Sequence, residues 1–357
     1  MKGKVYVGFI FSLLCVFAFS VCLADGAYTI EQMRQDHFER LMEDNYLDEG
    51  TTIEDCFSAI DIPIQEMLRS SALVQGNIYL LANECIYRID ADRNMTSLQF
   101  ADDISAEQRN AFQQLFEFDD ALYALLSFRT GEPLLTSEYV KIDIQDNVVH
   151  LGESILLDTG FYQEKDGLAV GHQSSLCRSG SSLFSLDYPT NKNMGSFIEY
   201  DILTGKGKEI AVVPGCYDLI VYNDSLLSLH ECAAYLSQVA DVTQYIEQCP
   251  SSRLLLQTNL ATGEWEIIQP LDGVPNTYAG QPMSMIYDAE NDDLYYCMKG
   301  KLHRVHGLDF STDTIIADAP GNWLQLTGCH TKSFLTEGYY VEIIPHVGVD
   351  YIPIPKA

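Results

Sequence analysis

The side chains that could do chemistry in this sequence lie in its longest predicted connections, not in a recognised motif. They combine aromatic rings with amide, carboxylate and imidazole groups: Tyr162, His172, Asp187, Tyr188, Asn276, Tyr278 and Trp323. Rings stack on apolar faces, and amides hydrogen-bond to hydroxyl or backbone groups, so this set suits an extracellular carbohydrate or a peptide or protein ligand. The alternative is that Trp323 and the tyrosines pack inside the protein, as most large aromatic side chains do.

Motifs for catalysis or for a bound cofactor do not occur in the sequence. There is no nucleophile elbow or phosphate loop, and no catalytic carboxylate pair stands out among 51 acidic residues. His303 and His306 are three apart, so on a strand they face opposite sides and cannot share a metal. The acidic run 288–293 lacks the spacing of a calcium loop. We therefore expect no metal and no cofactor, and the sequence favours a protein that is not an enzyme.

The charge balance excludes two classes of partner. The formal net charge is -30, from 51 acidic and 21 basic residues. Repulsion at this charge opposes binding to nucleic acid or to an anionic membrane surface.

The first residues predict export. Lys2 and Lys4 precede an apolar run that ends near Leu23, which is typical of a signal peptide over residues 1–24 with cleavage before Asp25. Two alternatives stay open: the run remains as a membrane anchor, or Cys22 carries a lipid. We expect an extracellular or cell-envelope protein whose only membrane contact is such an anchor.

Residues 25–70 predict an N-terminal helical and acidic segment. Thr29 and Gln32 form a capping box at the start of a helix over 30–42. Two further helices are expected over 105–116 and over an insertion at 233–248.

The eight cysteines beyond the signal are widely scattered, which favours buried free thiols. Cys232 and Cys249 bracket the predicted insertion helix and are the one pair that we consider for a disulfide.

Residues 71–357 repeat a unit of four short strands. Five passages, among them "IEYDILTGKGKEIAVV" and "LLQTNLATGEWEII", share a strand, a polar turn and a second strand. Their predicted turn anchors are spaced by 50 (309 minus 259) to 58 (259 minus 201) residues: Asp90, Asp143, Asp201, Asn259 and Asp309. Four strands at such a period predict an all-β fold, a β-propeller of about six four-stranded blades. A β-sandwich is the alternative, but it requires no constant period. We expect the ring to close with residues 50–70 or the chain to have once continued.

The rhythm "G-x-I-Y … Y-x-I-D" between Gly76 and Asp90 resembles secreted bacterial β-propellers and the lipoprotein-receptor type of propeller. The Tyr-Trp-Thr-Asp motif of the receptor propellers is absent, so the resemblance implies the fold and no functional residue. The chain is also similar to exported gut-bacterial proteins that place a propeller before a solute-binding domain.

Two kinds of connection must alternate between the faces of such a disc. Turns within the first and second strand pairs of a blade are short, whereas the connections on the other face are long and carry the seven candidate residues. The favoured function is an exported, non-enzymatic binding or scaffold propeller with its ligand on that loop-rich face. The alternatives are a propeller-type glycoside hydrolase or lyase, which needs carboxylates converging in the central channel, and an accessory module of a solute-binding or transport system.

Overall fold

The computed structural model divides into two compact units, Met1–Ile53 and Glu54–Ala357. It describes residues 29–131, 134–157, 170–189, 194–214, 216–231, 253–271, 279–326 and 331–355. In these residues no helix is both long enough and apolar enough to cross a membrane. The predicted signal peptide lies outside them.

The first unit contains helix α2 (Ile30–Glu43). The predicted capping box is present: the Thr29 hydroxyl accepts a hydrogen bond from the Gln32 backbone, and the Gln32 side chain accepts one from the Thr29 backbone. Met33, Phe38 and Leu41 recur at helical spacing and are buried. The expected helix over 30–42 is therefore confirmed. Helix α3 (Ile53–Phe57) spans the boundary between the two units in the sequence.

The second unit is a propeller of six blades with four antiparallel strands each. The outer strands of blades 1 and 2 also pair in parallel, Gln99 with Val148 and Phe100 with Val149, so these two blades form one eight-stranded sheet. Blade 1 contains β2 (Ser70–Val74), β3 (Asn77–Leu81), β4 (Cys85–Ile89) and β5 (Met95–Phe100). Blade 2 contains β6 (Phe112–Phe118), β7 (Ala121–Gly131), β8 (Leu134–Gln145) and β9 (Val148–Leu156). Blade 3 contains β10 (Val170–Ser179), β11 (Ser182–Pro189), β12 (Met194–Asp201) and β13 (Gly207–Pro214). Blade 4 contains β14 (Cys216–Tyr222), β15 (Ser225–Glu231), β16 (Arg253–Asn259) and β17 (Trp265–Leu271). Blade 5 contains β18 (Met285–Asp288), β19 (Asp293–Met298), β20 (Lys301–His306) and β21 (Thr314–Asp318).

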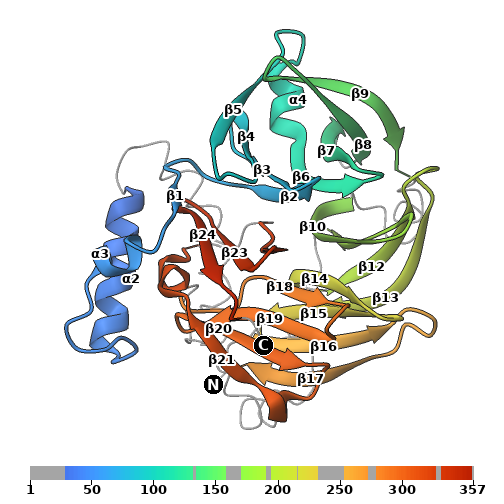
Figure 1. Cartoon of the computed structure of the whole chain (residues 1–357). Coiled ribbons are helices and arrows are strands. Elements are labelled where there is room, and N and C mark those ends of the chain that lie inside the picture. The colour runs from blue at the N-terminus through green and yellow to red at the C-terminus, as the bar shows by residue number, and fades with distance from the viewer. Residues whose placement is uncertain are drawn as a thin grey trace, which may run out of the picture. The chain divides into compact units, whose positions relative to one another are not determined.

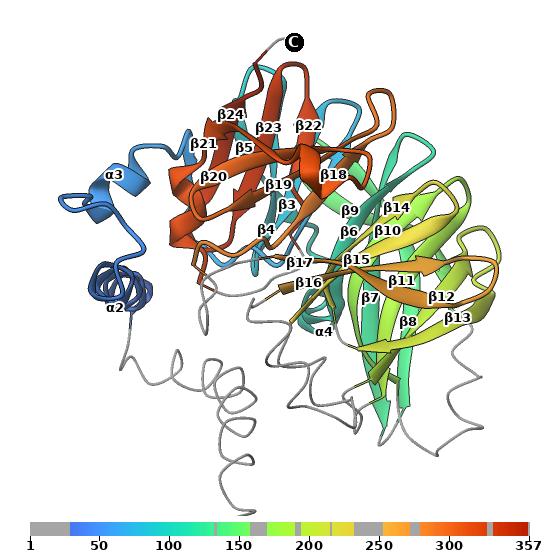
Figure 2. The same ribbon diagram turned by 90° about the horizontal axis from the view of Figure 1, so that it is seen from below.

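Blade 6 combines the two ends of the propeller sequence. Its inner strands are β22 (Phe334–Thr336), β23 (Tyr339–Ile344) and β24 (Gly348–Pro353), and its outer strand is β1 (Ile62–Pro63). Ile62 pairs with Val349 and Pro63 with Gly348, so the ring closes with residues from the expected range 50–70. Figure 1 shows the sheets following one another in chain order until red β24 lies beside blue β1, and Figure 2 shows the same sheets from below.

The core consists of six separate apolar layers, one between each pair of consecutive blades. Successive side chains of a strand point to opposite faces of its sheet, so each blade packs against both of its neighbours. Between blades 3 and 4, for example, Phe184 and Phe197 pack against Leu219 and Leu226. The described cysteines that are free thiols belong to this buried or half-buried set: Cys56, Cys85, Cys177, Cys216 and Cys297.

The repeated turn that first indicated blades has the same hydrogen bonds in blades 3 and 4. Asp201 Oδ1 accepts from the backbone of Leu203 and Thr204 at 2.9 and 3.0 Å. Asn259 Oδ1 accepts from Ala261 and Thr262 at the same two distances. These side chains fix the outer hairpin of each blade.

The glycine of each repeated turn also contacts the preceding blade. Gly205 and Gly263 have φ of +70° and +71°. A Cβ at Gly205 would lie 3.1 Å from the carbonyl carbon of Leu156 and closer still to its oxygen, and one at Gly263 would meet Ile210 in the same way. Glycine is required here by both the backbone angle and the approach of a second backbone.

Two expectations about local structure were wrong. The helix expected over 105–116 is only α4 (Ala106–Ala111), because Phe112–Phe118 pairs along β7 and its apolar side chains enter the layers between blades. Asp143 does not anchor a turn: it lies in β8 opposite His150, and the turn is formed three residues later by Asp146 and Asn147, both at positive φ. The predicted insertion helix and the Cys232–Cys249 pair lie outside the described residues.

Candidate functional site

The first strand of every blade has one free edge, and these six edges surround a central cavity. Each of β2, β6, β10, β14, β18 and β22 is the terminal strand of its sheet. The cavity has a volume of about 380 Å³ and takes its lining from all six strands and from Lys332. A free strand edge presents unpaired backbone N–H and C=O groups, so the wall offers hydrogen bonds as well as side chains.

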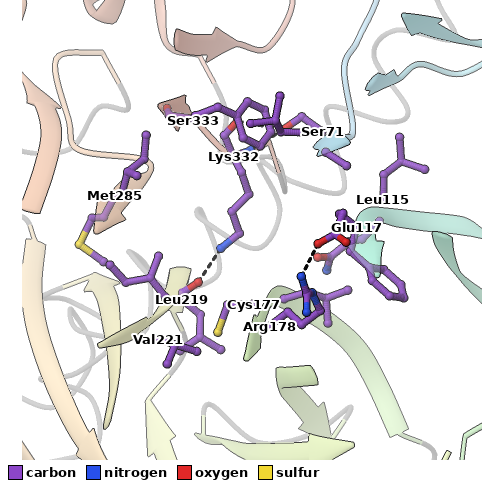
Figure 3. Close-up of a pocket in the computed structure, with 18 of the residues that line it drawn as sticks. Ser71, Leu115, Glu117, Cys177, Arg178, Leu219, Val221, Met285, Lys332 and Ser333 are labelled. Carbon is purple, nitrogen blue, oxygen red and sulfur yellow. Dashed lines mark hydrogen bonds and ion pairs between the residues drawn. The ribbon is translucent and has the colours of Figure 1, made fainter. Parts of the chain in front are cut away.

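Lys332 crosses this central cavity from blade 6 toward blade 4 (Figure 3). Its ammonium forms an ion pair with the Asp218 carboxylate and donates a hydrogen bond of 2.6 Å to the carbonyl of Leu219. The backbone of Lys332 is fixed as well, because its N–H donates to the Ser71 hydroxyl, which in turn donates to its carbonyl. The lysine is therefore held at both ends.

Asp218 is almost completely buried, with 2% of its surface exposed. Its Oδ1 also accepts a hydrogen bond from the Leu219 backbone, and Oδ2 accepts one from Met285 of blade 5 at 2.7 Å. A buried carboxylate is tolerated only when it is paired and hydrogen-bonded, and Asp218 has both kinds of partner. It connects blades 4, 5 and 6.

Arg178 and Glu117 form a second ion pair in the cavity wall, between blades 3 and 2. Arg178 also donates to the carbonyl of Gly180 at 2.8 Å, and Glu117 accepts from the backbone of Asp120 at 3.0 Å. Both residues lie near the ends of their strands, whereas Lys332 and Asp218 lie near the starts of theirs. The two pairs therefore occupy different depths of the channel.

Serine hydroxyls join neighbouring blades at the start of the inner strands. Ser70 accepts from the backbone of Leu115, across blades 1 and 2, and Ser284 accepts from Ser333, across blades 5 and 6, both at 2.9 Å. With the Ser71–Lys332 contact, these bonds bring blade-edge backbone groups together around the channel mouth.

The electrostatic balance of the channel differs from that of the whole chain. Two cations, Lys332 and Arg178, are matched by two carboxylates, Asp218 and Glu117. Burial raises the pKa of the neighbouring Cys177 thiol to about 12, which leaves it an uncharged and unreactive group at neutral pH. The described wall is thus close to neutral in a protein of formal charge -30.

The seven residues predicted from the sequence do not include the residues of this channel. Tyr162, Asn276 and Tyr278 lie outside the described residues. His172 lies in the first part of β10, and Asp187 and Tyr188 lie in the last part of β11, where the two strands pair. The backbones of these three residues therefore meet at one end of blade 3, on the face that carries the longer connections.

Trp323 lies in the 3₁₀ helix η2 (Pro320–Leu324), in the connection between blades 5 and 6. Its ring packs against Gly280 and Gly300: a Cβ at either glycine would lie within 3 Å of indole atoms. It is only half-buried. Its packing role is clear, and a contact with a ligand stays a prediction.

The sequence contains a signal for one channel residue. Asp218 is a charged residue inside a largely apolar strand, "CYDLIVY". A charge in a buried strand is rare unless it has a partner. Nothing in the sequence indicated that Lys332 is the partner, since 114 residues separate it from Asp218 (332 minus 218).

Comparison with known proteins shows the fold and no family. No protein-family model matches the chain, and no curated protein sequence matches it. Among solved structures, a glucose dehydrogenase matches with a TM-score of 0.52 at 10% identity, over 83% of this chain and 98% of its own. A gluconolactonase of Xanthomonas campestris matches with a TM-score of 0.51 at 10% identity, over 83% of this chain and 88% of its own.

A structure of a nidogen/laminin complex matches with a TM-score of 0.43 at 12% identity, over 70% of this chain and 79% of its own. The matches with TM-scores above 0.5 show that this chain shares its β-propeller fold with a glucose dehydrogenase and a gluconolactonase. At these identities the likeness does not decide between catalysis and binding.

Proposed function

We propose that this chain is an exported, non-enzymatic binding propeller whose central channel holds an uncharged carbohydrate. The observation that supports this is the wall of the 380 Å³ cavity, where free strand edges surround two neutralised ion pairs. This volume lies within the range of about 300–1,000 Å³ that is usual for small-molecule sites. An uncharged polar ligand gains hydrogen bonds from such a wall without an opposing charge.

The lining also contains the rings and apolar surface that a sugar requires. Tyr287 and Phe334 lie among the lining residues, together with the serines Ser71 and Ser333, whereas the ring of Phe116 is buried against Tyr139 between blades 2 and 3. Aromatic rings stack on the apolar faces of sugars, and hydroxyl and backbone groups bind their hydroxyls. We expect the residues predicted from the sequence, such as Tyr188 and Tyr278, to contact the same ligand.

The described channel favours binding over glycoside hydrolysis. Hydrolysis needs one carboxyl group as an acid and another as a base or nucleophile, on either side of the scissile bond. In the described wall, Glu117 is held by Arg178 and Asp218 by Lys332, and Asp218 is further saturated by backbone donors. A carboxyl group that acts on a glycosidic bond must be able to contact it, and the partners that hold Glu117 and Asp218 oppose such a contact.

The test is a glycan and peptide array on the purified mature protein, followed by titration of any ligand found. The double variant Lys332→Met/Asp218→Asn removes both charges of one pair while keeping the shape of both side chains. We expect it to weaken a channel-bound glycan by about tenfold or more, since hydrogen bonds to charged groups contribute about 1.5–3 kcal/mol.

Tyr188→Ala and Tyr278→Ala form the comparison arm of the titration. A glycan that loses affinity in these two variants but not in the double variant would place the site on the loops and not in the channel. Binding of peptides alone on the array would overturn the assignment of the ligand class.

A further inference from the structure

Two acidic side chains are buried side by side between blades 5 and 6, away from the channel wall. Glu342 in β23 is directly opposite Asp350 in β24, and residues directly opposite each other in an antiparallel pair share one face. Their neighbours along the strands, Tyr340 and Ile352, belong to the apolar layer that also contains Cys297 of blade 5. Glu342 and Asp350 are only 4% and 5% exposed.

A third polar group joins this pair from the connection between the blades. The Gln325 amide N–H and the Cys297 thiol donate hydrogen bonds to the Glu342 carboxylate, and Gln325 is 2% exposed. Asn322 donates to Glu342 Oε1 at 3.2 Å, and its other contacts, to Gln281 and Gly300, hold it in place. The connection therefore closes over the two acids.

Three oxygen atoms of this group have no hydrogen-bond partner in the part of the chain that the structure describes: Glu342 Oε2, Asp350 Oδ2 and Gln325 Oε1. The charges that act on the two acids are negative, Asp350 on Glu342 and Asp61 on Asp350. Burying acceptor oxygens without a donor costs free energy, and burying two like charges costs more. Something positive must complete the group, either a bound cation or protons on the acids themselves.

We propose that Glu342, Asp350 and Gln325 form a binding site for a divalent cation of the calcium type, which ties the last blade to the connection that precedes it. Hard cations take carboxylate and amide oxygens as ligands, and these three are the kinds of oxygen present. Oxygen ligands suit a hard cation and not a soft one, which is why a cation of the calcium type is proposed. The inference does not depend on the proposed carbohydrate function.

The position of the site gives the cation a role in closing the ring. Asp350 follows Gly348 and Val349, the two residues that pair with β1. Asp61, just before β1, accepts a hydrogen bond of 3.0 Å from the backbone of Tyr351. A cation at Asp350 would therefore stabilise the blade in which both ends of the propeller sequence meet.

The experiment measures thermal unfolding of the mature protein at pH 7.5, first with a chelator and then with excess Ca²⁺, Mg²⁺ or Mn²⁺. We expect Ca²⁺ to raise the Tm of the unsubstituted protein by about 4 °C, as a ligand in large excess over its Kd does for the folded state. The variants Glu342→Gln and Asp350→Asn keep the side-chain shape, and their Tm should no longer respond. Glu290→Gln, in an exposed acidic turn, is the matched control for loose Ca²⁺ binding and should keep the full response.

Direct binding keeps the proposal falsifiable if a variant is poorly folded. Terbium(III) replaces Ca²⁺ at oxygen sites and luminesces when a nearby Tyr or Trp is excited. We expect one tight terbium site, lost in Gln325→Leu as well as in the two acid variants. A Tm that responds to pH but to none of the three metals would show that protons complete the group and would overturn the proposal. A Ca²⁺ response that survives in the double variant Glu342→Gln/Asp350→Asn would overturn it as well.

Discussion

The outer rim of the propeller repeats the same residues from blade to blade, whereas the polar residues of its interior differ between blades. At the rim, blades 3 and 4 repeat one turn with the same capping oxygen, the same glycine and the same contact with the preceding blade. In the channel and between blades 5 and 6, the polar residues are specific to one blade, as with Lys332, Asp218 and Glu342. The repeated turns thus stabilise the contacts between blades, and the polar residues that are not repeated form the candidate sites. Four measurements test this contrast.

The largest effect is expected at the rim glycines. Gly205→Ala and Gly263→Ala should each lower the free energy of unfolding by about 4 kcal/mol. An L residue at positive φ costs about 1–2 kcal/mol, and overlap with packed atoms adds about 1–3 kcal/mol. The measurement is denaturant unfolding of each variant.

Two glycines of the short inner turns provide the control for this prediction. Gly76 and Gly338 have similar φ, +75° and +77°, but a Cβ there would meet no atom within 4 Å. Their alanine variants should lose only about 1 kcal/mol, the cost of the backbone angle alone. Equal losses at all four positions would contradict the contact between rim turns and neighbouring blades.

Next in size is the loss of one partner of the buried ion pair. Lys332→Met should destabilise the protein by about 3 kcal/mol, since it leaves the Asp218 charge buried, although two backbone donors remain. Adding Asp218→Asn should recover most of the loss. A double-mutant cycle by chemical denaturation measures this coupling, and additive losses would show that the two side chains do not act as a pair.

The buried acids predict a pH dependence that the rim does not have. Burial, with repulsion from Asp350, raises the pKa of Glu342 to about 8, and burial, with repulsion from Asp61, raises that of Asp350 to about 7. The folded protein then holds protons that the unfolded chain has released. Stability should therefore fall as the pH rises from about 4 to 8 in the presence of a chelator. Unfolding curves of Glu342→Gln/Asp350→Asn should lose this slope, and a retained slope would assign it to other groups.

The smallest effect is expected at the capping oxygens of the rim turns. Asp201→Ala and Asn259→Ala should each cost about 1 kcal/mol, by analogy with the loss of a helix-capping oxygen. Because the turns are equivalent, the two losses should agree within about 0.5 kcal/mol. Neither variant should alter ligand binding, since these turns lie on the face away from the longer connections. A binding defect without a stability change would refute this assignment of the faces.

The local elements and their period were determined by the sequence. The helix over 30–42, the hairpins around Asp201 and Asn259 and the count of about six blades follow from neighbouring residues, because caps, turns and strand alternation are short-range effects. The same short-range reasoning failed at Phe112–Phe118, where pairing with β7 outweighed a weak helical pattern. It also placed one turn three residues early, at Asp143.

Only the tertiary structure decided which distant residues meet. Lys332 reaches Asp218, Glu117 reaches Arg178, and Ile62 pairs with Val349 because the chain closes into a ring. Closing the ring brings six free strand edges to one axis and apolar faces to six interfaces, and a charge buried there is stable only beside a partner from another blade. The partner cannot be predicted from the spacing of residues in the sequence. The contact depends on the angle between blades and not on the separation along the chain. The strands and turns of each blade therefore follow from the sequence, whereas the contacts of the candidate sites follow from the closure of the ring.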